Sequence, residues 1–106
     1  RRRSRRAAAR TSVKIQCRKG ALGLGPNIGN KMLDISDSGL RMIIAQSVDL
    51  LAEVEIIIDG YGMKDRIKRI GNVRWQVKMD DGQFLVGIEF QKCLSYRDWQ
   101  IIASPN

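Results

Sequence analysis

Two short clusters of polar residues have the types and spacing for ligand chemistry. Arg6 and Arg10 lie four positions apart near the start of the chain, and Asp34 and Ser36 lie two positions apart further along. A guanidinium can grip a phosphate through two N–H groups and stack on a planar base. A carboxylate only accepts hydrogen bonds, so it suits the N–H donors on the pairing edge of guanine, whereas arginine suits the O6 and N7 acceptors. The two clusters together predict recognition of a guanine nucleotide.

Catalytic chemistry has little support in this chain. Histidine is absent from the sequence, which removes Ser/His and Cys/His arrangements and most transition-metal sites. The neighbouring carboxylates Asp80 and Asp81 fall in a predicted turn, where aspartate is common for backbone reasons. Asp34 and Asp37 form a second pair, again without a nucleophile. We therefore expect no enzyme, no catalytic residue, no metal and no cofactor other than a bound ligand.

The charge of the chain is concentrated at one end. Residues 1–33 contain ten basic side chains and no acid, whereas residues 34–106 contain nine bases and eleven acids. Residues 1–10 are only Arg, Ser and Ala, so they are predicted to form a flexible basic arm attached to a domain of residues 11–106. Such an arm indicates an anionic partner. It can act as a nucleic-acid clamp, or it can fold back over the domain, because Arg10 directly precedes the first predicted strand.

The rest of the chain alternates apolar and polar residues in the manner of β-strands. Six strands separated by turns predict an all-β fold, either a small antiparallel barrel or a sandwich. Closure into a barrel would also remove exposed strand edges. A bend is expected at Gly71, and a short C-terminal helix of about residues 94–103 should begin at the N-cap Ser95. The predicted strands are Thr11–Arg18, Lys31–Ile35, Leu40–Ala45, Val48–Asp59, Asp65–Met79 and Gln83–Phe90.

Alternation within residues 33–36 should place Asp34 and Ser36 side by side on the outer face of the barrel, with Gly39 allowing a close turn afterwards. A purely structural interpretation remains open, in which Asp34 and Ser36 only cap that turn. Cys17 and Cys93 lie far apart in the sequence. Two reduced thiols, as in a cytoplasmic protein, are favoured over a single disulfide.

These motifs resemble those of PilZ domains, bacterial receptors for the second messenger cyclic di-GMP. The family carries an RxxxR arm followed by [D/N]xSxxG, matched here by RAAAR at residues 6–10 and DISDSG at residues 34–39. The stretches GNVRW at 71–75 and VGIEF at 86–90 also match. RxxxR also occurs at residues 1–5 and 2–6. Residues 6–10 are assigned to the motif because Arg10 lies a short distance before the first predicted strand. The resemblance covers about residues 5–92.

The resemblance implies a PilZ-like fold, a six-stranded antiparallel β-barrel with a C-terminal helix. It also implies roles for individual residues. Arg6 and Arg10 would hold the phosphates and guanine rings, Asp34 and Ser36 would bond a guanine, and Gly39 would allow close approach. The residue before RxxxR is Arg5, which favours a stacked pair of ligands over a single one. Trp75 would border the ligand, or else belong to the core.

We therefore expect a cytoplasmic bacterial cyclic di-GMP receptor domain that orders its arginine-rich arm over the barrel. A downstream protein or a fused domain would read the resulting surface. No nucleic-acid partner and no membrane span are expected. Two alternatives remain: a ligand-independent PilZ-like adaptor that binds a protein, and a small nucleic-acid-binding barrel with a basic arm.

Overall fold

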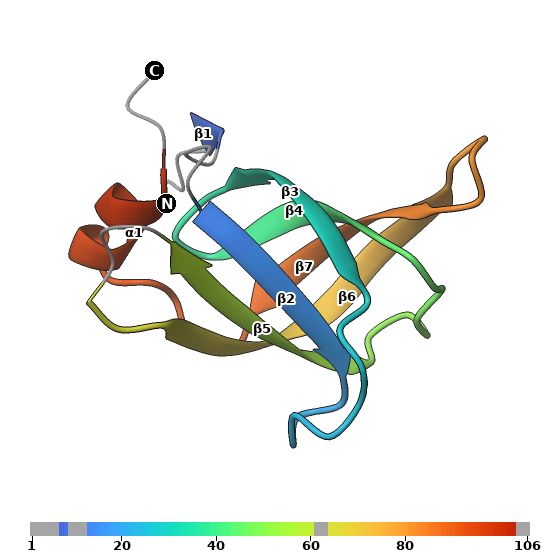
Figure 1. Cartoon of the computed structure of the whole chain (residues 1–106), viewed down its shortest axis with the longest axis horizontal. Helices are drawn as coiled ribbons and strands as arrows, with labels where there is room; N and C mark the ends of the chain where they lie inside the picture. The colour runs from blue at the N-terminus through green and yellow to red at the C-terminus, as the bar shows by residue number, and fades with distance from the viewer. Residues whose placement is uncertain (1–6, 9–12, 61–63, 104–106) are drawn as a thin grey trace.

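A computed structural model describes residues 7–8, 13–60 and 64–103. Most of these residues lie in one antiparallel sheet that curls into a half-barrel, with a short helix at one end (Figure 1). The all-β fold is thereby confirmed. The elements are β1 (Ala7–Ala8), β2 (Val13–Lys19), β3 (Gly29–Ile35), β4 (Gly39–Ile44), β5 (Glu53–Gly60), β6 (Ile67–Lys78), β7 (Phe84–Phe90) and α1 (Tyr96–Ile102).

The strands are arranged in the order β1-β3-β4-β7-β6-β5-β2, and every neighbouring pair is antiparallel. Curling brings β2 back towards β3, where the Ile28 N–H donates to the carbonyl of Cys17 at 2.8 Å. The six longer strands correspond to the six predicted strands. The additional two-residue strand β1 was not predicted, because its two alanines belong to the expected arm; β1 pairs with β3.

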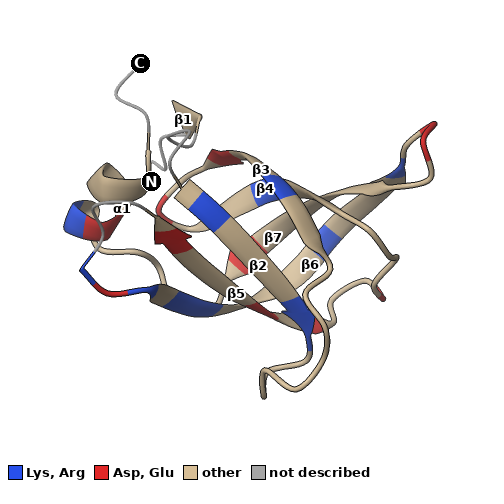
Figure 2. Ribbon diagram, viewed as in Figure 1, with Lys and Arg blue, Asp and Glu red and all other residues tan. Residues whose placement is uncertain are grey.

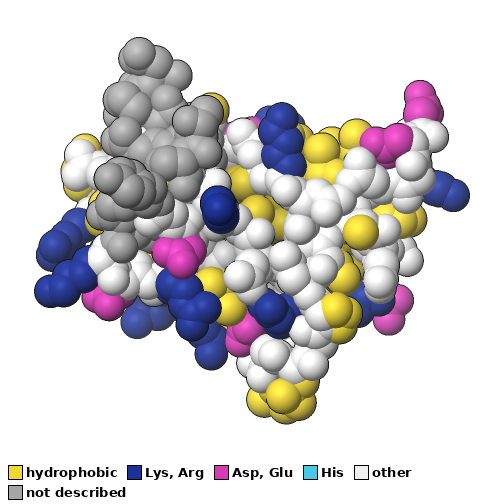
Figure 3. Space-filling model, in the orientation of Figure 1, with side chains coloured by type: hydrophobic (Ala, Val, Ile, Leu, Met, Phe, Trp, Pro, Cys, Tyr) yellow, Lys and Arg dark blue, Asp and Glu magenta, His cyan; other side chains and the backbone are white. Residues whose placement is uncertain are grey.

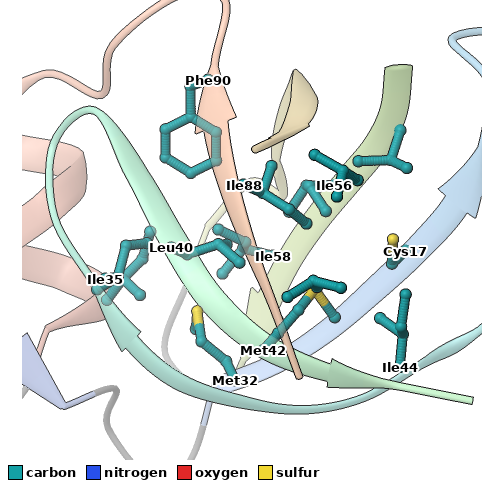
Figure 4. Packing of buried hydrophobic residues seen from close by; sticks show 14 of the residues in the cluster. Cys17, Met32, Ile35, Leu40, Met42, Ile44, Ile56, Ile58, Ile88 and Phe90 are labelled. Carbon is teal, nitrogen blue, oxygen red and sulfur yellow. The ribbon is translucent and has the colours of Figure 1, made fainter. Parts of the chain in front are cut away.

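The core fills the inside of the curled sheet (Figure 4). Its members come from alternate positions of the strands, as the period of two requires. Full burial of one such aliphatic side chain is worth about 2 kcal/mol, so the strands are held mainly by this cluster. The completely or almost completely buried residues include Ile35, Leu40, Met42, Ile44, Ile56, Ile58, Val73 and Val86.

The predicted strand Val48–Asp59 is correct only in its second half. The chain turns before Glu53, with Leu51 at φ +67° and its N–H bonded to the Val73 carbonyl at 2.7 Å. Alternation along Val48–Asp59 would place Leu50 on the inward face and Glu55 on the opposite one. Leu50 is instead 62% exposed, and Glu55 is buried and pairs with Lys68 at 3.3 Å. Leu50 departs from the alternation because the turn precedes the regular pleat. Glu55 keeps its place on the outward face of β5 but is covered by the loop at Gly23, where a Cβ would lie 2.8 Å from its carboxylate.

The irregularity of β6 also lies later than predicted. Pairing with β7 shifts register between Val73 and Trp75, and not at Gly71. Gly71 has a different role, because a Cβ there would lie 2.5 Å from Cγ2 of Ile88. The register shift turns Trp75 towards the outer face of the sheet, where its side chain is 38% exposed.

The C-terminal helix forms where it was expected. Ser95 caps it by accepting a hydrogen bond from the Asp98 N–H at 3.0 Å. Ile102 and the preceding Leu94 are buried, and the indole N–H of Trp99 lies 3.4 Å from the Ile35 carbonyl. The helix therefore packs on the end of the barrel. Among the described residues, no helix is long and apolar enough to cross a membrane.

Candidate ligand-binding site

The carboxylate of Asp34 lies at the edge of β3 and is bonded to an arginine that sequence reasoning missed. Arg41 is its direct partner in the β3–β4 pairing. The Arg41 Nε donates to Oδ2 of Asp34 at 2.8 Å, and its Nη2 donates to the same oxygen. This hydrogen bond and the nearby negative charge raise the pKa of Arg41. The position of Arg41, two residues beyond Gly39 in a hairpin, was the available signal.

Ser36 does not lie on the outer face, which corrects the prediction from alternation. Its side chain is completely buried. The hydroxyl lies 3.3 Å from the carbonyl of Gly39 and 3.3 Å from the Ser38 hydroxyl, and it accepts a bond from the Ser38 N–H at 3.3 Å. The pleat ends at Ile35, so Ser36 starts the turn instead of continuing the strand. For Ser36 the turn-capping interpretation is the one the geometry supports.

Gly39 is required by a close approach of two strands. A Cβ at this position would lie 2.2 Å from the Ile88 carbonyl oxygen. The turn that precedes it is held by backbone bonds from Phe90 to the Ser38 carbonyl at 2.8 Å and from Leu94 to the Asp37 carbonyl at 2.7 Å. The DISDSG segment is thus fastened to both β7 and the residues before α1.

Trp75 provides a flat apolar surface on the outer face of the sheet. Gly87 lies opposite it in the β6–β7 pairing, and a Cβ on Gly87 would lie 2.3 Å from the indole Nε1. The ring therefore lies across the gap left by the glycine. Trp75 is on the outer face, which excludes its assignment to the core.

Strand pairing places four of these residues in a row across the sheet. Asp34 pairs with Arg41, Arg41 pairs with Gly87, and Gly87 pairs with Trp75. The row therefore offers a carboxylate, a guanidinium and an indole on four adjacent strands. A shallow pocket of about 200 Å³ adjoins it, lined by Ser38, Gly39, Arg74, Trp75, Gly87, Ile88 and Glu89.

The predicted site residues Arg5, Arg6 and Arg10 lie outside the described residues. The middle of RAAAR is described, however, because Ala7 pairs with Ile35 and Ala8 pairs with Asp34. The RAAAR motif is thus attached at its centre to the strand that carries Asp34. The two motifs, which are separated in the sequence, meet at this edge of the sheet.

Acidic groups on the same turn add to the polarity of the site. Asp37 follows Ser36, and its Oδ1 is buried with no hydrogen-bond partner among the described residues. In the wall of the pocket, Arg74 pairs with Glu89 at 3.1 Å. Lys and Arg residues also occur on several other strands and on α1 (Figure 2). The arrangement suits a planar ligand that carries both N–H donors and anionic groups. The described residues contain no cluster of side chains suited to a metal ion.

Comparison with protein families matches residues 1–102 to the PilZ domain. The chain therefore belongs to the PilZ domain family. No curated protein sequence matches it. Among solved structures, Bacillus subtilis inhibitor of motility (MotI/DgrA) is similar with a TM-score of 0.67 and 16% identity, covering 97% of this chain and 48% of that one.

A second similar structure is that of the Klebsiella pneumoniae MrkH–cyclic di-GMP complex. Its TM-score is 0.62 at 19% identity, over 96% of this chain and 49% of MrkH. At these identities the likeness shows the shared fold. The chain spans about half the length of both structures.

Proposed function

We propose that this chain is a cyclic di-GMP receptor domain without enzymatic activity. The observation that carries the proposal is the pairing of Ala7 and Ala8 with the strand of Asp34, because it joins the centre of RAAAR to the acidic motif. Membership of the PilZ family and the ligand named for MrkH support the same conclusion.

In this proposal different site residues bind different parts of the ligand. Arg6 and Arg10 bind the phosphates and stack on guanine, because guanidinium suits both tasks. Asp34 accepts the N1–H and N2–H of a guanine, and Trp75 offers an apolar face beside it. Gly39 lets the turn lie close to β7, because a Cβ at this position would lie 2.2 Å from the Ile88 carbonyl oxygen.

Ser36 is proposed as a positioning residue. Its buried hydroxyl bonds the turn at the Gly39 carbonyl and the Ser38 N–H. Loss of these bonds would leave buried polar groups of the turn without partners. Ser36 therefore stabilises the turn that follows β3, and this turn fixes the orientation of Asp34.

Arg41 determines how the Asp34 carboxylate is held before the ligand binds. Its bonds to Asp34 hold the carboxylate in place, but their free energy is modest, because the Arg41 side chain is 44% exposed. A carboxylate has about four lone-pair positions. A guanine can therefore share Asp34 with Arg41, or displace it.

In the signalling step of the proposal, the ligand orders the arginines of the arm over the barrel, on either side of the Ala7–Ala8 strand that already pairs with β3. Arg5, directly before the motif, favours a stacked pair of cyclic di-GMP molecules. A partner protein or a fused domain would recognise the new surface made by the arm, ligand and barrel.

Isothermal titration calorimetry with cyclic di-GMP tests this function, at about 0.15 M salt, where long-range attraction is screened. GMP and a linear diguanylate are the controls. Arg6→Ala and Arg10→Ala should weaken binding far more than Arg2→Ala. Equal losses from all three would indicate a diffuse basic tail. No binding at all would refute the receptor hypothesis and favour the ligand-independent protein adaptor.

A further inference from the structure

A second charged surface lies at the end of the barrel that carries the helix. A groove of about 630 Å³ runs between α1 and the start of β6. Figure 2 shows Lys and Arg positions at the start of β6 and on α1, and Figure 3 shows Lys and Arg side chains gathered on the same flank. The charged residues that line it are Lys64, Asp65, Arg66, Lys68, Arg69, Arg97 and Asp98.

Only part of this positive charge is neutralised within the protein. Arg69 lies 3.7 Å from Asp98 and donates to the Lys92 carbonyl at 3.1 Å. Lys68 pairs with Glu55. These contacts fix one wall of the groove.

The remaining three cations of the groove are Lys64, Arg66 and Arg97. Within residues 7–8, 13–60 and 64–103, no carboxylate lies at ion-pair distance from any of them. All three are exposed. They leave a surplus of positive charge exposed to solvent, which an anionic partner would complement.

The lining favours an acidic protein segment over nucleic acid. Asp65 and Asp98 interrupt the cations and would repel a continuous row of phosphates. None of the described residues that line the groove is aromatic, so this described lining offers single-stranded bases no stacking surface. Ile101 is 39% exposed at the groove and can receive one apolar side chain.

We infer that this groove binds an acidic segment of a partner protein, with carboxylates at Arg66 and Arg97 and an apolar residue against Ile101. None of the residues that line the groove belongs to the Asp34 row or lines the pocket beside it, so the groove is a second surface of the domain. It would give the domain a docking face of its own.

Fluorescence anisotropy with a labelled peptide, in which glutamates flank two leucines, tests the inference. The double variant Arg66→Glu/Arg97→Glu should weaken binding about tenfold or more. The control Lys19→Glu/Lys78→Glu changes the net charge equally, at exposed residues outside the groove, and should change binding little. The same peptide with glutamine in place of glutamate should not bind.

Three results would overturn the inference: no saturable binding of the acidic peptide, equal losses from the two double variants, or tighter binding of labelled oligo-dT that also depends on Arg66 and Arg97. Cyclic di-GMP titrations of the same variants keep this test separate from the proposed function. Both double variants should bind that nucleotide as the unaltered chain does.

Discussion

Replacing Gly39 by alanine should damage both the fold and the site. The new methyl carbon would lie 2.2 Å from the Ile88 carbonyl oxygen, whereas such C···O contacts normally need about 3.3 Å. β4 and β7 would have to separate by about 1 Å. Overpacking of this kind costs about 2 kcal/mol, and weakening the Ser36 bond to the Gly39 carbonyl adds about 1 kcal/mol.

Chemical denaturation of Gly39→Ala measures this loss directly. A decrease of about 3 kcal/mol in the free energy of unfolding corresponds to a fall of roughly 15 °C in Tm for a domain of this size. Gly25→Ala is the matched control, because nothing lies within 4 Å of a Cβ at Gly25. If both variants unfolded alike, the close approach of the strands would not be the reason for glycine at position 39.

Three further outcomes follow from the contacts of single residues. Arg41→Met should change stability by less than about 1 kcal/mol, as for an exposed ion pair, yet alter cyclic di-GMP affinity through Asp34; an unchanged affinity in calorimetry would remove Arg41 from the site. Asp37→Ala should leave the unliganded domain as stable or more stable, because it removes a buried acceptor without a partner, and a large loss of stability on denaturation would contradict this. Burial raises the pKa of the Cys17 thiol to about 12, so the unfolded chain loses this proton first and stability should fall above about pH 9. Cys17→Ala should abolish that decline in pH-dependent denaturation; an identical pH profile for both proteins would be inconsistent with it.

The sequence predicted the strands well where alternation continued without interruption. β7 and β4 follow the expected pattern, with Val86, Ile88, Leu40 and Met42 buried. Ser95 as N-cap was also recognisable, because capping is a local property of the chain. Both cysteines are free, with Cys17 buried and Cys93 exposed, as favoured.

The errors arose where tertiary contacts override the period of two. The turn before Glu53 and the register shift beyond Val73 both depend on neighbouring strands. Ser36 was misplaced for the same reason, since the end of a pleat cannot be seen in alternation alone. The Asp34–Arg41 bond required the register of β3 against β4, which short motifs do not contain.

Amide chemical shifts of the ¹⁵N-labelled chain during titration with cyclic di-GMP provide the most direct test of the proposed site. The largest changes should occur at Ala8, Asp34, Arg41, Trp75 and Gly87, which the sheet brings into one row. Changes confined to the groove between α1 and β6, or saturation without any change in this row, would contradict the proposed site.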